Sequence, residues 1–239
     1  MSNHDHIAAI LGAEILKGTH PADGNMPSEP RLIRRFRVSR TVIREVMKTL
    51  AAKGFVVSKT RIGTRVKDPV HWNLFDADVL SWRVGIGLDA EFVRSLTEVR
   101  RAVEPAAAAL AAERRTTADL ADMRSHVGSM ARPGHTRESF AQADLALHLA
   151  IGRASGNPLM RSLAGVIEAA LLTSFMYSSP IDHPRSHDVS VKSHAAIVDA
   201  IEARDPSGAA KATLKVIDAG ARRIEAKRRA LRRRRTGKA

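Results

Sequence analysis

The chain has 239 residues, of which 44% are hydrophobic and only 4% aromatic, and its formal net charge is +14. The length suggests two domains, and alanine-rich runs such as PAAAALAA at 105–112 favour helices over sheets. The absence of cysteine excludes a disulfide-stapled fold, and we find neither a secretory leader nor an apolar run of about 18 residues, so we expect a mostly α, cytoplasmic protein without a membrane partner.

The charge is distributed unevenly along the chain. Residues 1–70 contain 13 Lys and Arg against 6 Asp and Glu, and residues 222–239 contain 10 against 1. Residues 71–221 are close to neutral, with 16 against 18. A basic head on a near-neutral body indicates a polyanionic partner, and nucleic acid is the first candidate.

The basic head, 1–68, shows the pattern of a small DNA-binding domain. Apolar spacing and end signals predict helices over 5–17, 29–36 and 40–53. Ser39 is a good N-cap for the third helix, which Gly54 should end. The alternation in FVVSKTRIGTRV predicts a β-hairpin. Three helices and a hairpin indicate a winged helix-turn-helix, whose third helix enters the major groove.

The third helix has one apolar and one basic face. The apolar face would pack into a core and consists of Ile43, Val46, Met47 and Leu50. The basic strip consists of Arg40, Arg44 and Lys48, which lie four residues apart. Such a strip is usually only a solvated face, but here it occurs with an N-cap, a glycine stop and a basic hairpin. We therefore expect the arginines to pair with guanines, and the hairpin tip to reach phosphate or the minor groove through Lys59, Thr60, Arg61 and Gly63.

Residues 7–66 resemble the winged helix of GntR-type regulators. The resemblance rests on MPSEPRLIRRFRVSRTVIREVMKTLAAKGFV followed by IGTRV. It implies DNA contacts from three residues of the third helix, Arg40, Thr41 and Arg44. It also implies that Gly63 lets the wing approach the DNA backbone. Pro30 stands where some members carry a DNA-contacting arginine, and Arg31 or Arg34 would replace that contact.

The rest of the chain is predicted to be helical. Residues 69–88 are expected to be a linker with a short helix at about 77–84, capped by Asp76, and Trp72 and Trp82 are expected to pack between the domains. Further helices are predicted at 89–114, 117–131, 136–155, 158–177, 187–204 and 206–231. The second domain, 89–231, is therefore expected to be an all-α antiparallel bundle. The basic tail, 232–239, would attract phosphate without reading sequence.

One motif in the second domain carries candidate chemistry. In ADLALH, Asp144 and His148 lie four residues apart, so both project from one helix face and could hold one ion. His194 is the natural third partner. An Asp–His hydrogen bond on a helix is at least as common as a metal site, and a single histidine near a helix start is more often a neighbour of the cap. Both interpretations remain open at this point.

The second domain resembles the FCD effector domain of the FadR subfamily over about residues 90–225. The resemblance rests on EVRRAVEPAAAALAAERRT, ADLALH and HAAIVDAIEARD, and HWNLFDADVLSW is similar to galactonate-responsive repressors of that subfamily. It implies a divalent metal, often zinc, held by Asp144, His148 and His194. Val216 and Ile217 stand where a fourth ligand is expected. The site is then either a three-ligand ion completed by water and effector oxygens, or a metal-free pocket in which the same groups form hydrogen bonds.

The resemblance also implies a carboxylate-binding pocket. Arg100 stands where the family places a carboxylate-binding arginine, whereas Arg101 points about 100° away and should lie on the surface. Arg222 or Arg223 would close the pocket from the last helix, and we favour Arg223. Ser190 would offer a hydroxyl to a sugar acid. A bidentate arginine–carboxylate pair selects an acid over its neutral analogue.

Together these patterns predict a transcription regulator rather than an enzyme. We expect a homodimeric repressor of sugar-acid catabolism, bound to a palindromic DNA operator and released by a small carboxylate effector, an aldonate such as galactonate or gluconate. Two alternatives are a metal-dependent hydrolase built on Asp144, His148 and His194, and a non-specific architectural DNA-binding protein. The first leaves the winged helix unexplained, and the second leaves the bundle without a role.

Overall fold

Two hydrophobic cores divide the chain into two units, Met1–Leu88 and Asp89–Ala239. The computed structural model describes residues 2–59, 63–87, 90–177, 179–182 and 184–236. Among the residues described, no helix combines the length and the apolar character needed to cross a membrane.

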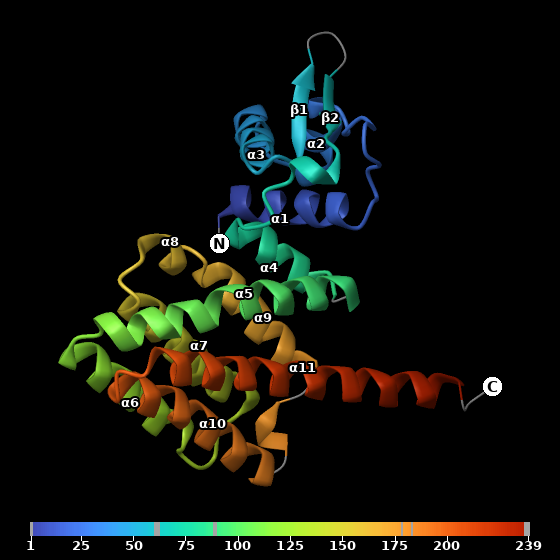
Figure 1. Cartoon of the computed structure of the whole chain (residues 1–239). Coiled ribbons are helices and arrows are strands. Elements are labelled where there is room, and N and C mark those ends of the chain that lie inside the picture. The colour runs from blue at the N-terminus through green and yellow to red at the C-terminus, as the bar shows by residue number, and fades with distance from the viewer. Residues whose placement is uncertain (1, 60–62, 88–89, 178, 183, 237–239) are drawn as a thin grey trace. The chain divides into compact units, whose positions relative to one another are not determined.

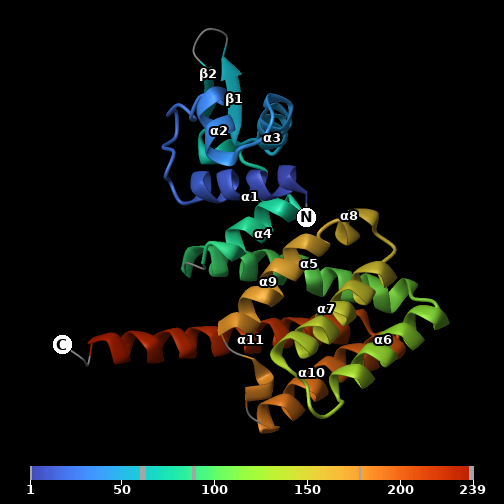
Figure 2. The ribbon, with the colours of Figure 1, turned by 180° about the vertical axis from the view of Figure 1, so that it is seen from behind.

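The first unit is a winged helix-turn-helix, as the sequence predicts. Its elements are α1 (Asn3–Leu16), α2 (Glu29–Phe36), α3 (Arg40–Ala52), β1 (Val56–Lys59) and β2 (Gly63–Val66). The two strands pair antiparallel, with Val56 opposite Val66 and Lys59 opposite Gly63. Within this unit the hairpin stands beside α2 and α3 (Figures 1 and 2).

Helix α3 begins and ends where local chemistry requires. The side chain of Ser39 accepts a hydrogen bond from the backbone N–H of Val42 at 3.3 Å. Gly54 follows the helix with φ +81°, a left-handed conformation that favours glycine. The apolar face is buried in the core and consists of Ile43, Val46, Met47 and Leu50. Burial of this face fixes the rotation of the helix and leaves its basic strip in solvent.

Residues 69–88, expected to be a linker, pack onto the first unit. They form η1 (Pro69–His71) and α4 (Ala77–Gly85), and Asp76 caps α4 by accepting hydrogen bonds from two backbone N–H groups. The ring of Phe55 lies 5.0 Å from that of Trp72 and 6.1 Å from that of Trp82. Both tryptophans therefore pack against the core of the first unit. Phe55, placed directly after α3, provides the aromatic surface that holds them.

Lys53 fastens α4 to the end of α3. Its side chain is 8% exposed, and its Nζ lies 2.6 Å from Oδ1 of Asp76 and 2.8 Å from Oδ2 of Asp78. The ammonium also lies 5.6 Å from the ring centroid of Trp82. Burial lowers the pKa of Lys53, but the two carboxylates outweigh this and hold it above its ordinary value. The linker helix is thus tied to α3 by charge as well as by aromatic packing.

The second unit is helical throughout its described part, as predicted. Its elements are α5 (Ala90–Arg114), α6 (Thr117–Met130), α7 (Arg137–Ala154), α8 (Pro158–Arg161), α9 (Ala164–Tyr177), η2 (Pro180–Asp182), α10 (Pro184–Glu202) and α11 (Pro206–Thr236). Helix α11 packs along α5 and α10, and α7 packs against α5, α6 and α9 (Figures 1 and 2). The largest fully buried side chains of this core include Phe140, Leu147 and Ile197.

Three helix boundaries of the second unit differ from the prediction. The helix expected over 158–177 is interrupted after Arg161 and resumes at Ala164. Helix α10 begins at Pro184 rather than 187, and proline is favoured in a first turn. Helix α11 continues to Thr236 rather than ending at 231, because alanine, lysine and arginine after position 224 are strong helix formers. Part of the expected tail, 232–239, is thus helix.

Gly12 of α1 allows the ring of Trp82 to lie directly against that helix. A Cβ at position 12 would meet Cε3 of Trp82 at 2.2 Å. We expect Gly12→Ala to displace the ring and to lower the free energy of unfolding of the first unit by about 1–3 kcal/mol, the usual cost of overpacking. Both tryptophans of the chain lie in this unit, so urea unfolding followed by tryptophan fluorescence measures the change.

Gly128 provides a matched control for this substitution. It is also a helical glycine, in α6, but an added Cβ would meet nothing within 4 Å. Gly128→Ala should therefore stabilise the second unit by up to about 1 kcal/mol, measured by circular dichroism. Equal stability of wild-type protein and Gly12→Ala would show that Trp82 does not pack on α1 as described.

Candidate functional site

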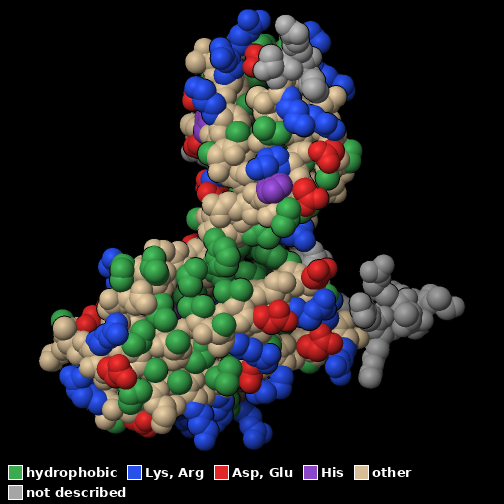
Figure 3. Space-filling view, turned by 45° about the horizontal axis from the view of Figure 1, so that its top comes forward, with side chains coloured by type: hydrophobic (Ala, Val, Ile, Leu, Met, Phe, Trp, Pro, Cys, Tyr) green, Lys and Arg blue, Asp and Glu red, His purple; other side chains and the backbone are tan. Residues whose placement is uncertain are grey.

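The basic strip of α3 is exposed, as the sequence predicts. Arg40, Thr41 and Arg44 are all exposed, and within the described part of the chain neither arginine forms a hydrogen bond or an ion pair. The side chain of Lys48 is 69% exposed, but its Nζ lies 2.8 Å from a carboxylate oxygen of Glu45. Lys and Arg side chains gather over the first unit in Figure 3. Two unpaired guanidinium groups at the start of α3 are therefore available to a ligand.

The wing provides further candidate contacts. Lys59 is exposed at the end of β1, and Gly63 opens β2 with φ +102°. An added Cβ at position 63 would meet nothing within 4 Å, so glycine is needed there for its backbone conformation rather than for space. Thr60 and Arg61 lie outside the described residues. Arg31 and Arg34 are both exposed on α2. Either remains a candidate for the DNA contact that some family members make with an arginine at the position of Pro30.

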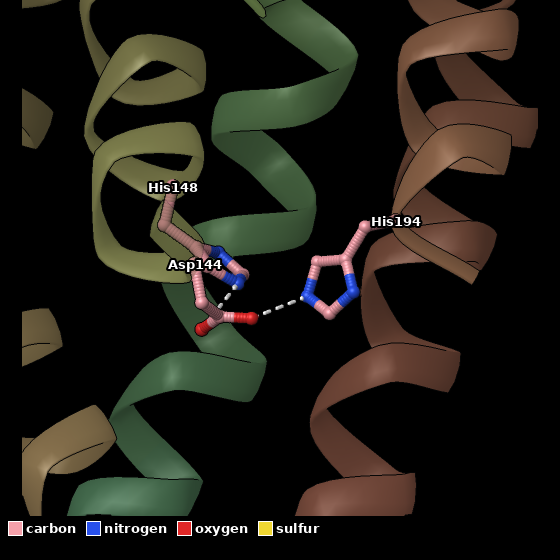
Figure 4. Close-up of side chains that lie close together, drawn as sticks. All are labelled: Asp144, His148 and His194. Carbon is pink, nitrogen blue, oxygen red and sulfur yellow. Dashed lines mark ion pairs between the residues drawn. The ribbon is translucent and has the colours of Figure 1, made fainter. Parts of the chain in front are cut away.

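The predicted metal-binding residues come together inside the second unit. Asp144 and His148 project from α7 toward His194 of α10 (Figure 4), and each of the three is at most 4% exposed. Nε2 of His194 lies 2.9 Å from Oδ1 of Asp144, and Nε2 of His148 lies 3.8 Å from Oδ2 of the same carboxylate. The two imidazole rings are 5.6 Å apart and nearly perpendicular, at 88°.

Both imidazoles are oriented by hydrogen bonds at Nδ1. Nδ1 of His194 donates to the backbone carbonyl of Ser190 at 2.7 Å, and Nδ1 of His148 donates to Oε2 of Glu104 at 2.7 Å. A carbonyl or carboxylate oxygen can only accept, so each neutral ring carries its lone pair on Nε2. Nε2 of His148 and Oδ2 of Asp144 are buried without a hydrogen-bond partner. Nε2 of His194 lies 2.9 Å from Oδ1 of Asp144, so it is an unsatisfied acceptor only while the ring is neutral.

This arrangement fits a divalent metal ion. Buried acceptors without partners are costly, and metal-binding histidines usually donate their second N–H to a carboxylate or a backbone carbonyl. The ligand atoms all lie within 4.8 Å of one another. Bond lengths of about 2.0–2.1 Å in tetrahedral zinc separate its ligand atoms by roughly 3.3 Å. The two Nε2 atoms lie 2.9 Å from Oδ1 and 3.8 Å from Oδ2 of Asp144, so the carboxylate would have to rotate for one oxygen to serve both. Small side-chain shifts would complete the geometry.

The expected fourth ligand is replaced by apolar side chains. Val216 and Ile217 of α11 are buried at 9% and 2% exposure, and among the described residues only Asp144, His148 and His194 form a metal-binding cluster. Three protein ligands leave one coordination position open, as in zinc sites that bind a further molecule. Water or an oxygen of a small ligand would take that position.

The same residues form an ion pair when no metal is bound. Burial lowers the pKa of His194, but the Asp144 carboxylate outweighs this and raises it above its ordinary value. Burial raises the pKa of Asp144, but the imidazolium holds it below its ordinary value. The metal-free alternative is therefore chemically possible, with His194 charged, and proton and metal would compete for Nε2 of this histidine.

Arg100 is buried at 8% exposure, but it already has a carboxylate partner within the chain. Its Nε and Nη2 both donate to Glu104, the second at 3.3 Å. Burial raises the pKa of Glu104, but Arg100 and His148 outweigh this and lower it to about 2. Sequence reasoning missed Glu104, although the spacing of four residues from Arg100 was a visible signal. Arg101, as expected, lies on the surface with its side chain 47% exposed.

Arg223 of α11 is half-buried, whereas the neighbouring Arg222 is exposed. Nε of Arg223 is buried and has no hydrogen-bond partner. Burial lowers the pKa of Arg223, and attraction to Asp144 opposes this effect. A half-buried guanidinium with an unsatisfied Nε, close enough to be attracted by Asp144, is a candidate anion contact.

The space beside these residues is small. A cavity of about 20 Å³ lies against Arg100, Thr97 and Gly220, and one of about 10 Å³ lies against His148 and Thr213. A water molecule needs roughly 10–15 Å³, so each cavity has room for about one. A six-carbon acid needs far more volume, and its binding would require the helices around the site to separate.

Comparison with known proteins agrees with this two-part architecture. Residues 3–66 match the family model described as bacterial regulatory proteins, gntR family, and residues 95–219 match the FCD domain. The chain is 32% identical to the galactonate operon transcriptional repressor of Escherichia coli (strain K12) over 225 residues, which cover 94% of this chain and 98% of that protein. It is 36% identical to the HTH-type transcriptional regulator LutR of Bacillus subtilis (strain 168) over 157 residues, 64% of this chain and 67% of that protein.

A solved structure of Lar, which controls the expression of the Listeria monocytogenes agr system, superposes with a TM-score of 0.62 and 19% identity. The match covers 92% of this chain and 96% of that chain. At this identity the likeness supports the fold alone.

Proposed function

The chain belongs to the gntR family of bacterial regulatory proteins and carries an FCD domain, and from this premise we propose that it is a repressor whose operator binding is controlled by a small carboxylate. It is a transcription regulator and not an enzyme, which removes the hydrolase alternative. The arginines of α3 would read the operator. The cluster of Asp144, His148 and His194 would hold zinc at the floor of the ligand site.

The observation that carries the proposal is the set of unsatisfied buried groups in the second unit. The candidate ligand atoms of Asp144, His148 and His194 lie within 4.8 Å of one another, and Arg223, whose buried Nε has no hydrogen-bond partner, is attracted to the Asp144 carboxylate. A metal ion with an open position, beside a guanidinium, suits a carboxylate that coordinates the ion with one oxygen and accepts hydrogen bonds with the other. Arg100 and the hydroxyl of Ser190 would supply further contacts.

The ligand class is proposed from likeness to a relative. The chain is 32% identical to a galactonate operon repressor over nearly its full length, which supports an aldonate such as galactonate or gluconate. Because the cavities at the site have room for about one water each, the acid would bind an opened form of the bundle. A ligand that binds one conformation more tightly shifts the population toward it, and that shift would release the operator.

We also propose that the regulator acts as a homodimer. An apolar strip runs along the outer face of α5 and consists of Val99, Ala102, Ala106 and Leu110, which are exposed or half-buried. A second copy of the chain would cover this strip. A dimer would bind a palindromic operator whose half-sites lie about one helical turn apart.

A thermal-shift screen tests the ligand site. With zinc present, we expect D-galactonate or D-gluconate to raise the melting temperature and neutral D-galactose to leave it unchanged. Arg223→Met should weaken the binding of the acid by about tenfold or more, because a hydrogen bond to a charged group contributes about 1.5–3 kcal/mol. Arg222→Met, at the exposed neighbouring position, is the matched control. Stabilisation by the neutral sugar but by none of the acids would refute the carboxylate site.

A further inference from the structure

Glu104 connects the two halves of the proposed ligand site. Its carboxylate accepts hydrogen bonds from Arg100, the proposed anion contact, and from Nδ1 of His148, a proposed metal ligand. We propose that Glu104 is a positioning residue that couples the two, so that an anion at Arg100 and a metal ion at His148 strengthen each other's binding. This inference rests on the proposed function of the site and extends it to its regulation.

The geometry forces Arg100 and His148 to share one negative charge. Oε2 of Glu104 lies 2.7 Å from Nδ1 of His148 and 3.3 Å from Nη2 of Arg100, and Oε1 accepts from Nε of Arg100. All three residues are at most 8% exposed. Water therefore screens these interactions little, and a change at one partner is felt by the other.

Arg100 keeps donors for a second anion while it holds Glu104. A guanidinium has five N–H donors, and Glu104 engages Nε and one N–H of Nη2. Three N–H groups on Nη1 and Nη2 remain. A bound carboxylate on those groups would share the positive charge of Arg100, and Glu104 would then interact more strongly with His148.

The effect on the metal follows from the chemistry of imidazole. A stronger acceptor at Nδ1–H makes Nε2 of the same ring a better donor to a metal, as carboxylates that contact ligand histidines commonly do. An anion at Arg100 would thereby raise the affinity for zinc, beyond any direct bond between the anion and the ion. Linkage requires that zinc raise the affinity for the anion by the same factor.

Zinc alone tests this coupling, through a double-mutant cycle on the full chain. Zinc affinity would be measured by chelator competition at pH 8.5, where protons compete little for the histidines, in wild-type protein, Arg100→Gln, Glu104→Gln and the double variant. We expect Glu104→Gln to weaken zinc binding by about 10–100-fold, because glutamine has no charge and a single acceptor oxygen. Arg100→Gln should tighten it by about threefold or more, since Glu104 then serves His148 alone.

The decisive comparison is between the two backgrounds. If Glu104 transmits the effect, Arg100→Gln changes zinc affinity less than about twofold once position 104 is glutamine. An equal effect in both backgrounds would mean that Arg100 acts on the ion directly through space, and would overturn the proposal. An unchanged zinc affinity in Glu104→Gln would also overturn the proposal. Arg101→Gln is the matched control, because this adjacent arginine is exposed and pairs with Asp218, and it should have no effect.

A second measurement observes the hydrogen bond of His148 directly in wild-type protein and uses a variant only to assign the signals. Nitrogen NMR of the zinc-free protein at pH 8.5 should show His148 as the Nδ1–H tautomer, assigned by the loss of its signals in His148→Asn. The Nε2–H tautomer would overturn the proposal. If wild-type protein binds no zinc, both the proposed metal site and the proposed coupling are refuted. If it binds zinc with an affinity that does not change in Glu104→Gln, only the coupling is refuted.

Discussion

Replacing both Arg40 and Arg44 by alanine should weaken specific operator binding by roughly thirtyfold to twenty-thousandfold. Both side chains are exposed near the start of α3, and within the described chain they form no hydrogen bond or ion pair. Each bidentate contact to a base contributes about 1–3 kcal/mol of discrimination, so two contribute about 2–6 kcal/mol. Gel-shift titration against the operator, mapped by footprinting, and against random DNA would measure the loss and show whether two chains bind each operator.

The controls distinguish the loss of base contacts from the loss of positive charge alone. Arg132→Ala with Arg185→Ala removes the same charge from exposed positions of the second unit and should leave operator specificity unchanged. Melting curves should show that the α3 variant remains folded, since no buried contact is lost. Full retention of specificity by Arg40→Ala/Arg44→Ala would contradict operator reading by α3. Equal affinity of wild-type protein for operator and random DNA would favour an architectural role instead.

Removal of any one of the three proposed metal ligands should abolish tight zinc binding. We expect Asp144→Ala, His148→Ala and His194→Ala each to weaken it by more than about a hundredfold, beyond the effect typical of residues that only contact a ligand. Zinc at a hundred times its Kd should stabilise the wild-type protein by about 2.7 kcal/mol, and it should not stabilise the variants. Isothermal calorimetry and thermal unfolding with zinc and with a chelator would measure both effects.

The surface of α6 offers a matched pair for this experiment. Asp122 and His126 have the same spacing as Asp144 and His148, and their side chains lie 3.2 Å apart but remain partly exposed. Loss of His126 should leave zinc binding unchanged. If wild-type protein binds no zinc and an aldonate still stabilises it, the metal-free form of the site, with His194 charged, is the correct one.

The winged helix was predictable because its signals are local. Ser39, Gly54 and the apolar stripe of α3 specify the start, end and rotation of one helix without reference to the rest of the chain. The exposure of Arg40 and Arg44 follows from that rotation. Resemblance to known regulators then supplied their roles, which periodicity alone could not.

The sites that sequence reasoning missed depend on contacts between distant segments. Nothing in the sequence near Trp72 or Trp82 indicates that Phe55 will contact both rings. Glu104 was read as part of an ordinary helix, because its importance arises from His148, which lies on another helix. Asp144 and His148 share one helix and were found together. His194 was named as their natural third partner, and the resemblance then favoured it as a ligand over a neighbour of the helix cap.

Lys53 and Phe55 together link helix α4 to helix α3. The ammonium of Lys53 bridges Asp76 and Asp78, and Phe55 contacts the indoles of Trp72 and Trp82. We therefore expect helices α3 and α4 to move as one rigid piece, so that any displacement of α4 would also displace Arg40 and Arg44.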